Sequence, residues 1–278
     1  MISRRALTVL AAFQLAILLT SPASAATRVS DPGLRSSSVL VLDATRSSVI
    51  YSRRSNVPVP IASITKLMTS LVVLDAKQPL DEKIKVTADD RSQGKGAFSR
   101  LAIGTTLTRG ELMRLALMSS ENRAAHALGR SYPGGLAACV KAMNAKARQL
   151  GMKSAKFIDP AGLSAGNVAS ADDLAKLVAA AARNPTISEY STAKDYTVRM
   201  GRQQLPFHNT NPLVRSAAWN IVVQKTGYLA EAGRCLVMQT VIDGRSVVIV
   251  LLNSFGKYTR TADARRIRRW MESSLNEA

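Results

Sequence analysis

The sequence predicts an α+β fold with one five-stranded antiparallel sheet that is built from both ends of the chain and flanked by helices. Residues 39–52 (VLVLDATRSSVIYS) contain two apolar, β-branched runs around a polar turn, which predicts two strands. Three further strand-like runs follow residue 212, and the last two meet at Asp243-Gly244, a dipeptide that favours a tight hairpin. The residues between these ends have helical patterns, so the sheet must join segments that are distant in sequence.

The helical middle region covers about residues 63–200. Apolar residues recur there at helical spacing, in segments rich in Ala, Leu, Met and Lys. Residues 53–62 contain two prolines and are expected to form a connector. The spacing predicts helices at 63–75, 109–118, 123–130, 136–150 and 171–183, and a last helix at about 261–274.

The first 25 residues have the order of features of a secretory signal peptide. Two arginines precede an apolar run over residues 6–19, and small residues end the segment at Ala25. A transmembrane anchor is the alternative, but Gln14 interrupts the run, which is shorter than the roughly 20 residues that a bilayer span needs. We therefore expect cleavage after Ala25, a flexible stretch at 26–36, and a single exported domain at 37–278.

The chain is strongly basic. It carries 38 Lys and Arg against 19 Asp and Glu, a net charge of +19, and 36 against 19 leaves +17 without the two arginines of the signal segment. Such an excess favours a polyanionic neighbour. Because an exported protein rarely meets nucleic acid, we expect peripheral contact with an anionic envelope polymer or a membrane surface instead. Arg265, Arg268 and Arg269 share one face of the last predicted helix, for which a solvated surface is the simpler explanation.

Cysteine and histidine are scarce. Cys139 and Cys235 are the only cysteines. Export permits a disulfide between them, but their spacing does not establish proximity, and two buried thiols are an equally open alternative. His126 and His208 are the only histidines, so no Cys/His cluster supports a zinc site. We expect neither a metal nor a cofactor.

The motif S-x-x-K, which can pair a serine nucleophile with a lysine base, occurs four times. The copies begin at Ser63, Ser92, Ser191 and Ser254. Only Ser63 is followed by a long apolar helical pattern, so only there does the spacing hold serine and lysine, here Lys66, on one face of an anchored helix. A lysine can take the serine proton if burial or a nearby like charge destabilises its ammonium form. A capping serine followed by a surface lysine explains the pair equally well.

Two further motifs follow along the chain. Ser120 and Asn122 form S-x-N between two predicted helices, and Lys225-Thr226-Gly227 ends a predicted strand. In the order S-x-x-K, S-x-N and K-T-G, the sequence resembles the penicillin-binding protein and serine β-lactamase superfamily. It is most similar to the low-molecular-mass D-alanyl-D-alanine carboxypeptidases and endopeptidases, which trim peptidoglycan. The supporting segments are PIASITKLMT, LMSSENRAA, FIDPAGLSAGNVASADDLAKL, NTNPLV and KTGYLAEAGRCLVM.

The resemblance implies a transpeptidase-like fold, a periplasmic location and an acyl-enzyme mechanism. Ser63 would attack the carbonyl between two D-amino acids after Lys66 takes its proton. Ser120 would relay a proton toward the leaving amine, and Asn122 would bind both Lys66 and the substrate amide. These four residues are the catalytic residues that the resemblance implies.

The K-T-G strand would bind the substrate. By the same resemblance, Lys225 and Thr226 would hold the substrate carboxylate, and Lys225 would also keep the lysine base partly neutral by repulsion. Gly227 would leave room for the substrate to pair with the strand edge. The backbone N–H groups of Ser63 and Tyr228 would form the oxyanion hole.

The implied substrates are peptidoglycan stem peptides, and β-lactams would act as covalent inhibitors. The most similar segments favour an endopeptidase that opens cross-links, with a carboxypeptidase acting mainly on pentapeptide monomers as the alternative. Glu272 and Asn276 match the E-x-x-L-N of class A β-lactamases, but they follow K-T-G instead of preceding it, so rapid β-lactam hydrolysis is not expected. Asp159, the only acidic residue in the comparable loop, is interpreted as structural.

Two other interpretations compete with this one. The segment GLSAG satisfies G-x-S-x-G around Ser164, and Asp173 and His208 follow in the order of an α/β-hydrolase. However, Pro160 breaks the preceding segment and Ser170 has the position of the next helix cap, so the strand and helix of a nucleophile elbow are not expected there. The other alternative, a basic peptidoglycan-binding scaffold without catalysis, conflicts with the presence of every motif residue.

Overall fold

The structure is a computed structural model that describes residues 31–91, 98–200 and 203–276. These described residues belong to one structural unit. The predicted signal peptide at 1–25 lies outside the described residues. Within the described ranges, no helix is both long enough and apolar enough to cross a bilayer.

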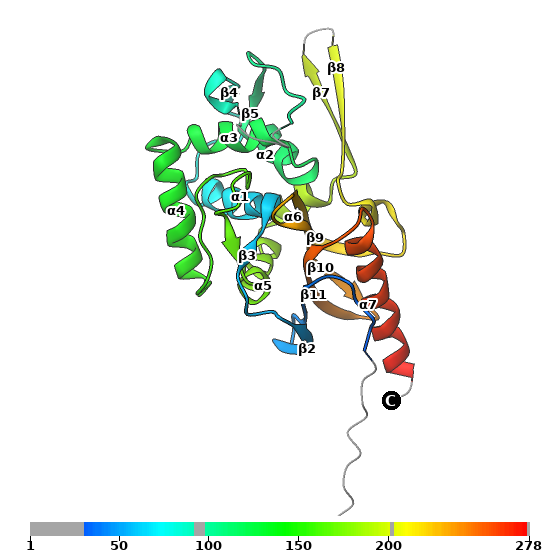
Figure 1. The fold of residues 1–278 in the computed structure, drawn as a ribbon. Coiled ribbons are helices and arrows are strands. Elements are labelled where there is room, and N and C mark those ends of the chain that lie inside the picture. The colour runs from blue at the N-terminus through cyan, green and yellow to red at the C-terminus, as the bar shows by residue number, and fades with distance from the viewer. Residues whose placement is uncertain (1–30, 92–97, 201–202, 277–278) are drawn as a thin grey trace, which may run out of the picture. The chain divides into compact units, whose positions relative to one another are not determined.

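A five-stranded antiparallel sheet runs through the domain in the order β2-β1-β11-β10-β9 (Figure 1). Strand β1 from the N-terminal part lies between β2 and β11, so the two ends of the chain meet in one sheet. The α+β prediction, with strands from both ends, is therefore confirmed. The strands are β1 (Ser38–Asp43), β2 (Ser48–Arg53), β9 (Asn220–Leu229), β10 (Gly233–Ile242) and β11 (Arg245–Ser254).

The sheet separates two hydrophobic cores because alternate side chains of a strand point to opposite faces. In β11, Val247, Ile249 and Leu251 pack toward one core, and the residues between them pack toward the other. Helix α7 (Thr259–Asn276) covers the first face, where Ile267 is buried. Helix α5 (Ala171–Ala182) and the helical region cover the second (Figure 1).

The helical region follows the predicted pattern closely. Ser170 caps α5 by accepting a hydrogen bond from the backbone N–H of Asp173, as expected from the sequence. The predicted helix at 63–75 begins instead as a one-turn 3-10 helix that contains Ser63. The elements are η1 (Ala62–Ile64), α1 (Thr65–Asp75), η2 (Ala88–Asp90), α2 (Arg109–Met118), α3 (Asn122–Arg130), α4 (Gly135–Gln149), α6 (Pro185–Thr192) and η3 (Pro212–Arg215).

Helix α6 and the pairing of three short strand pairs were not predicted, although residues 196–200 (YTVRM) have a β-like sequence. Asn184 caps α6 and Pro185 occupies its first turn, but the helix is short and its Thr, Ser and Tyr residues have weak helical propensity. Within the nominally helical region, β7 and β8 form a hairpin that projects from the helices (Figure 1). The pairs are β3 (Val59–Pro60) with β6 (Val168–Ala169), β4 (Lys83–Lys85) with β5 (Thr106–Thr108), and β7 (Asp195–Met200) with β8 (Gln203–His208).

Residues 34–36 pack onto the domain, whereas the sequence suggested flexibility through residue 36. Leu34 and Ser36 are buried. The backbone N–H of Ser36 donates to the buried carboxylate of Asp263 in α7 at 2.7 Å, and the hydroxyl of Ser36 donates to it at 2.6 Å. The carboxylate thus ties the segment before β1 to the last helix.

The two cysteines are buried free thiols. Burial raises the pKa of Cys139 to about 12 and that of Cys235 to about 11. The alternative of two buried thiols is therefore correct, and the disulfide is not formed in this structure.

Candidate active site

Ser63 and Lys66 are in direct contact. The hydroxyl Oγ of Ser63 lies 2.8 Å from Nζ of Lys66 and 3.5 Å from the carbonyl oxygen of Ala161. Neither η1 nor α1 has a side-chain capping hydrogen bond, and Lys66 is fully buried. The alternative of a capping serine followed by a surface lysine is therefore wrong for this copy of S-x-x-K.

The other copies of S-x-x-K lack this arrangement. Ser191 is buried in α6 while Lys194 is exposed, and Ser254 is buried at the end of β11 while Lys257 is exposed. The copy at 92–95 lies outside the described residues. Helix α1 thus distinguishes the Ser63 copy from both of the others that the structure describes.

The amine of Lys66 has three hydrogen-bond partners. Besides Ser63 Oγ, it contacts Oδ1 of Asn122 at 2.9 Å and the carbonyl oxygen of Ala161 at 2.6 Å. The amide of Asn122 is oriented by its own donor, because Nδ2 donates to the carbonyl oxygen of Phe98 at 3.0 Å. The second motif therefore meets the first through Asn122, the first residue of α3.

Burial lowers the pKa of Lys66 to about 7, against the opposing charges of Asp159 and Glu121. A neutral amine has two hydrogens and one lone pair. Asn122 Oδ1 and the Ala161 carbonyl can only accept, so they take the two hydrogens. The lone pair is then left for the hydroxyl hydrogen of Ser63, which is the geometry of a general base and its nucleophile.

Lys225 lies next to this pair on β9, the edge strand of the sheet. It is fully buried, and its amine donates to the carbonyl oxygen of Thr226 at 2.8 Å. Burial, then the charges of Lys66 and Arg260, hold the pKa of Lys225 well below its usual range. The pKa of Lys66 is lowered first by burial, so repulsion from Lys225 is not the main cause that the sequence suggested.

Gly227 brings β9 against the backbone at Ser63. A Cβ atom at Gly227 would lie 2.9 Å from the carbonyl oxygen of Ile61 and 3.2 Å from the backbone nitrogen of Ser63. Side chains do not tolerate such distances, so a larger residue would push the strand away from η1. The absence of a side chain is what allows the K-T-G strand and the serine to share one site.

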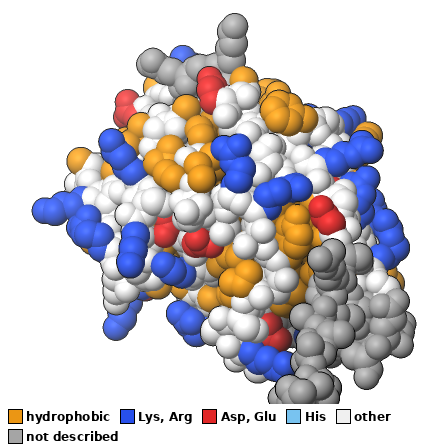
Figure 2. Space-filling view, turned by 60° about the horizontal axis from the view of Figure 1, so that its bottom comes forward, with side chains coloured by type: hydrophobic (Ala, Val, Ile, Leu, Met, Phe, Trp, Pro, Cys, Tyr) orange, Lys and Arg blue, Asp and Glu red, His pale blue; other side chains and the backbone are white. Residues whose placement is uncertain are grey.

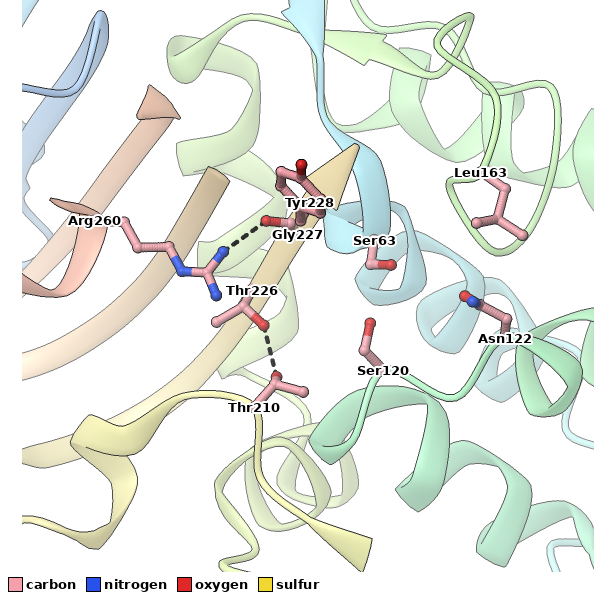
Figure 3. A pocket seen from close by; sticks show the side chains of 9 residues that line it. All are labelled: Ser63, Ser120, Asn122, Leu163, Thr210, Thr226, Gly227, Tyr228 and Arg260. Atoms are coloured by element: carbon pink, nitrogen blue, oxygen red, sulfur yellow. Dashed lines mark hydrogen bonds between the residues drawn. The ribbon is translucent and has the colours of Figure 1, made fainter. Parts of the chain in front are cut away.

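Ser120 occupies the connection between α2 and α3. Its φ of 61° is in the left-handed region that serine rarely adopts. The adjacent buried Glu121 accepts hydrogen bonds from the hydroxyl of Ser99 and from the backbone N–H of Arg100. Such backbone conformations persist where the surroundings hold them, and here the result is a Ser120 hydroxyl directed into the site (Figure 3).

These residues surround one pocket of about 200 Å³. Six of the eight predicted site residues line it, and Lys66 and Lys225 are buried behind them. Figure 3 shows side chains from η1, the α2–α3 connection, β9 and α7 converging on it. The lining residues are Ser63, Ser120, Asn122, Leu163, Thr210, Thr226, Gly227, Tyr228 and Arg260.

Three lining residues were not predicted. Arg260 reaches the pocket from α7, and its Nη1 donates to the carbonyl oxygen of Gly227 at 2.8 Å. Burial and Arg234 lower the pKa of Arg260 to about 10, and no carboxylate of the described residues forms an ion pair with it. Thr210 shares a 2.6 Å hydrogen bond with Thr226, and Leu163 forms the opposite wall. Thr210 lies in the distinctive NTNPLV segment, but no local pattern marks Arg260.

The α/β-hydrolase alternative is not supported by the structure. Ser164 lies in an irregular loop, where its hydroxyl accepts from the backbone N–H of Gly166. Asp173 contacts Ser154 and the N-terminus of α5. His208 contacts Asp195 at the base of the β7–β8 hairpin. The three residues of the supposed triad therefore belong to separate local structures.

Glu272, which matches the first residue of the β-lactamase motif E-x-x-L-N, lies in α7 and forms a 2.7 Å ion pair with Arg268. It does not line the pocket. Among the described residues, no group of His, Cys, Asp and Glu side chains could hold a metal ion. The side chains gathered at the pocket are those of the serine, the two lysines and their hydrogen-bond partners.

The family model for D-alanyl-D-alanine carboxypeptidase matches residues 25–256. The chain belongs to this family. It is 50% identical to the D-alanyl-D-alanine endopeptidase of Pseudomonas aeruginosa over 242 residues, which cover 86% of this chain and 78% of that protein. It is 46% identical to the D-alanyl-D-alanine endopeptidase of Escherichia coli over 271 residues, or 94% of this chain and 87% of that protein.

A solved structure of the family has the same architecture. The D-alanyl-D-alanine carboxypeptidase of Mycobacterium tuberculosis matches with a TM-score of 0.81 at 25% identity, over 89% of this chain and 95% of that chain. Penicillin-binding protein D2 of Listeria monocytogenes, solved in its cefotaxime-bound form, matches with a TM-score of 0.75 at 27% identity, over 85% and 97%. The predicted serine peptidase family and its transpeptidase-like fold are thus confirmed.

Proposed function

We propose that this family member is a periplasmic serine D-alanyl-D-alanine endopeptidase that opens peptide cross-links in peptidoglycan. The observation that carries the proposal is the buried amine of Lys66, which lies 2.8 Å from the hydroxyl Oγ of Ser63 and also contacts two oxygens that can only accept hydrogen bonds. The relatives that match most of the chain at 50% and 46% identity are named endopeptidases, which supports this activity over a carboxypeptidase.

The first step forms an acyl-enzyme. Oγ of Ser63 attacks the carbonyl carbon between two D-amino acids while Lys66 takes the hydroxyl proton. The C–N bond then breaks, and the proton passes through Ser120 to the leaving amine. Water attacks the ester in the second step, Lys66 takes a proton from this water, and Ser63 recovers its hydroxyl proton as the acid product leaves.

The oxyanion of each tetrahedral intermediate would be held by the backbone N–H groups of Ser63 and Tyr228. The close approach of β9 to η1 at Gly227 supports this assignment, because it brings the two segments within contact distance. Removing one preformed donor of this kind typically costs about 2.7–4 kcal/mol of transition-state stabilisation.

In the substrate, the residue beyond the scissile bond carries a carboxylate. The pocket provides a guanidinium group and two hydroxyl groups that can donate hydrogen bonds to it. The guanidinium of Arg260 lines the pocket beside Thr226, and Thr210 and Thr226 present a hydrogen-bonded hydroxyl pair. Lys225 is fully buried, and its amine is engaged by the carbonyl oxygen of Thr226. We therefore assign direct carboxylate binding to Arg260 and the threonines, and electrostatic support to Lys225.

The same serine would be acylated by penicillin, whose strained amide mimics the scissile bond. Among the described residues, no carboxylate contacts the hydroxyl of Ser63; the acceptor there is the carbonyl oxygen of Ala161. A water positioned for rapid ester hydrolysis would lack a base on that side, so the penicillin adduct should be long-lived.

A side-by-side digestion tests the choice of substrate. Purified cross-linked muropeptide dimers and pentapeptide monomers are incubated with the wild-type protein and with Ser63→Ala, and the products are weighed by mass spectrometry. The proposal requires that wild type converts dimers to monomers faster than it removes D-alanine from the pentapeptide. Preferential release of D-alanine would assign the carboxypeptidase alternative.

The basic surface supports peripheral contact with an anionic envelope polymer. Figure 2 shows Lys and Arg side chains spread over one face, with few acidic ones between them. Arg265 and Arg269 are exposed on α7, whereas Arg268 pairs with Glu272 and stacks over the ring of Trp219. Retention of Ser63→Ala on isolated peptidoglycan sacculi should fall as salt is added, because screening weakens contacts between exposed charges.

A further inference from the structure

Asp159 organises the loop that faces the two catalytic side chains. Its Oδ1 accepts backbone N–H groups from Ala161 at 2.8 Å, Gly162 at 2.6 Å and Leu163 at 3.3 Å, and its Oδ2 accepts that of Ser164 at 3.0 Å. One carboxylate thus satisfies four consecutive donors. The turn from 161 to 164 is folded around this side chain.

The folded turn delivers a carbonyl group to the site. The carbonyl oxygen of Ala161 lies 2.6 Å from the amine of Lys66, the shortest of that amine's three contacts. The next residue, Gly162, is pressed against η1, since a Cβ there would lie only 2.0 Å from the carbonyl oxygen of Ala62. Small displacements of the turn would therefore move an acceptor away from Lys66.

The loop is anchored on both sides of Asp159. The carbonyl oxygen of Pro160 accepts from the hydroxyl of Thr69 in α1 at 2.7 Å. Asn167 accepts the backbone N–H groups of Ile158 and Asp159, and it donates to Thr65 at the start of α1. These bonds hold the loop ends to the helix that carries Lys66, and the Asp159 carboxylate determines the path between them.

Asp159 also contributes charge. Two carboxylates act on the pKa of Lys66, Asp159 in the loop and Glu121 in the α2–α3 connection, and the charge of Lys66 in turn lowers the pKa of His126 in α3 and of Lys225 in β9. Asp159 contributes more than Glu121 to the opposing charge that raises the pKa of Lys66 against its burial. Burial lowers the pKa of His126, which favours the neutral form of this imidazole.

We propose that Asp159 is a positioning residue of the reaction, whose carboxylate holds the Ala161 carbonyl on the Lys66 amine and keeps a negative charge beside it. The inference rests on the proposed function, because it requires Lys66 to act as the base. It extends the structural role expected from the sequence, since the side chain governs both the direction of the lone pair and the pH range in which Lys66 is neutral.

The test is the pH dependence of Ser63 acylation by a fluorescent penicillin, measured as a second-order rate constant. In Asp159→Asn, the amide cannot accept all four N–H groups, and the negative charge is lost. We expect the rate on the alkaline plateau to fall about tenfold or more, as a misplaced catalytic group does. The acid limb of the pH–rate profile, where the rate rises as Lys66 loses its proton, should move to lower pH, because the pKa of Lys66 falls when a nearby negative charge is removed.

Matched variants separate positioning from stability. Asp173→Asn removes another buried carboxylate, which accepts the backbone N–H groups of Ser154 and Ser170 and does not line the pocket. It should lower the melting temperature and leave the acid limb in place. Asp159→Glu keeps the negative charge, so the acid side of its pH–rate profile should lie at the wild-type pH. Asp159→Ala should shift the acid side of the profile as Asp159→Asn does. Either of these two neutral variants can be used for the test, provided that it unfolds cooperatively.

An acid limb at the wild-type pH in a cooperatively folded neutral variant would overturn the inference, as would a wild-type plateau rate. If the wild-type protein itself is not acylated, the proposed function fails, which is a different result. The two failures are thus distinguished by the wild-type measurement alone.

Discussion

Lys66 Nζ lies 2.8 Å from Ser63 Oγ, and its two other partners are oxygens that can only accept hydrogen bonds. This relationship gives a single orientation to the neutral amine. It explains why a motif that occurs four times in the sequence has chemical meaning at one position.

Replacing Lys66 should remove the base without removing the nucleophile. Lys66→Gln should lower the rate of Ser63 acylation by roughly 10²–10⁴-fold, the usual contribution of a general base. Stopped-flow measurement with a fluorescent penicillin gives the rate. Lys194→Gln, in a copy of S-x-x-K with an exposed lysine, is the control and should acylate like wild type. Equal rates for the two variants would contradict the assignment.

The acylation rate should rise with pH through about 7. Burial lowers the pKa of Lys66 to about 7, so the amine is protonated and inactive below this value and neutral above it. A rate profile with a single ionisation on its acid side checks this. A flat profile across neutral pH, in protein that stays folded, is not compatible with Lys66 as the base.

Adding one methyl group at Gly227 should impair both the site and the fold. In Gly227→Ala, the new Cβ would lie 2.9 Å from the backbone oxygen of Ile61, so β9 or η1 must shift. We expect a loss of about 1–3 kcal/mol of unfolding free energy, as for other overpacked sites, together with slower acylation. Urea unfolding and penicillin kinetics measure the two effects, and wild-type acylation would show that the close approach is unnecessary.

Arg260 should matter for substrates that carry a carboxylate beyond the scissile bond. Arg260→Ala removes a guanidinium that has no acidic partner in the described part of the chain. Hydrogen bonds to charged groups contribute about 1.5–3 kcal/mol, so KM should rise by roughly one to two orders of magnitude. Arg269→Ala, an exposed arginine on the same helix, is the control. If Arg260→Ala raises KM for an amidated substrate as much as for the substrate with a free carboxylate, carboxylate binding is not the role of Arg260.

The thiols should be inert in the folded protein. Burial raises the pKa of both Cys139 and Cys235, so neither forms thiolate near neutral pH, and the thiolate is the reactive species. Iodoacetamide should leave the native protein unmodified and should alkylate two cysteines after denaturation. A missing pair of alkylation sites in unreduced, denatured protein would reveal a disulfide instead.

Much of the fold was predictable because its elements have strong local patterns. The period-two alternation in β11 and the capping serine of α5 are both visible in the sequence. Helix α6 was missed because its residues have weak helical propensity and its stability comes from tertiary packing of residues such as the buried Ile187. The 3-10 turn at Ser63 was missed because hydrophobic spacing does not distinguish it from the first turn of a helix.

The residues of the site that belong to sequence motifs were predictable, whereas those that only the fold brings to the site were not. Ser63, Asn122 and Gly227 come together as the motif order suggests. Arg260 enters only because α7 follows β11 back across the sheet to β9, a relationship that no local sequence pattern records. The sequence shows that Asp159 is the acidic residue of its loop. Its four backbone contacts could not be predicted, because they depend on the path of the turn at residues 161–164.

The most direct test of the account is the identity of the residue that penicillin acylates. Wild-type protein is incubated with benzylpenicillin and digested, and the adduct is mapped by mass spectrometry alongside Ser63→Ala and Ser164→Ala. The account predicts a single adduct on Ser63, unchanged in Ser164→Ala and absent from Ser63→Ala. An adduct that persists in Ser63→Ala, or that maps to another serine in wild type, would contradict it.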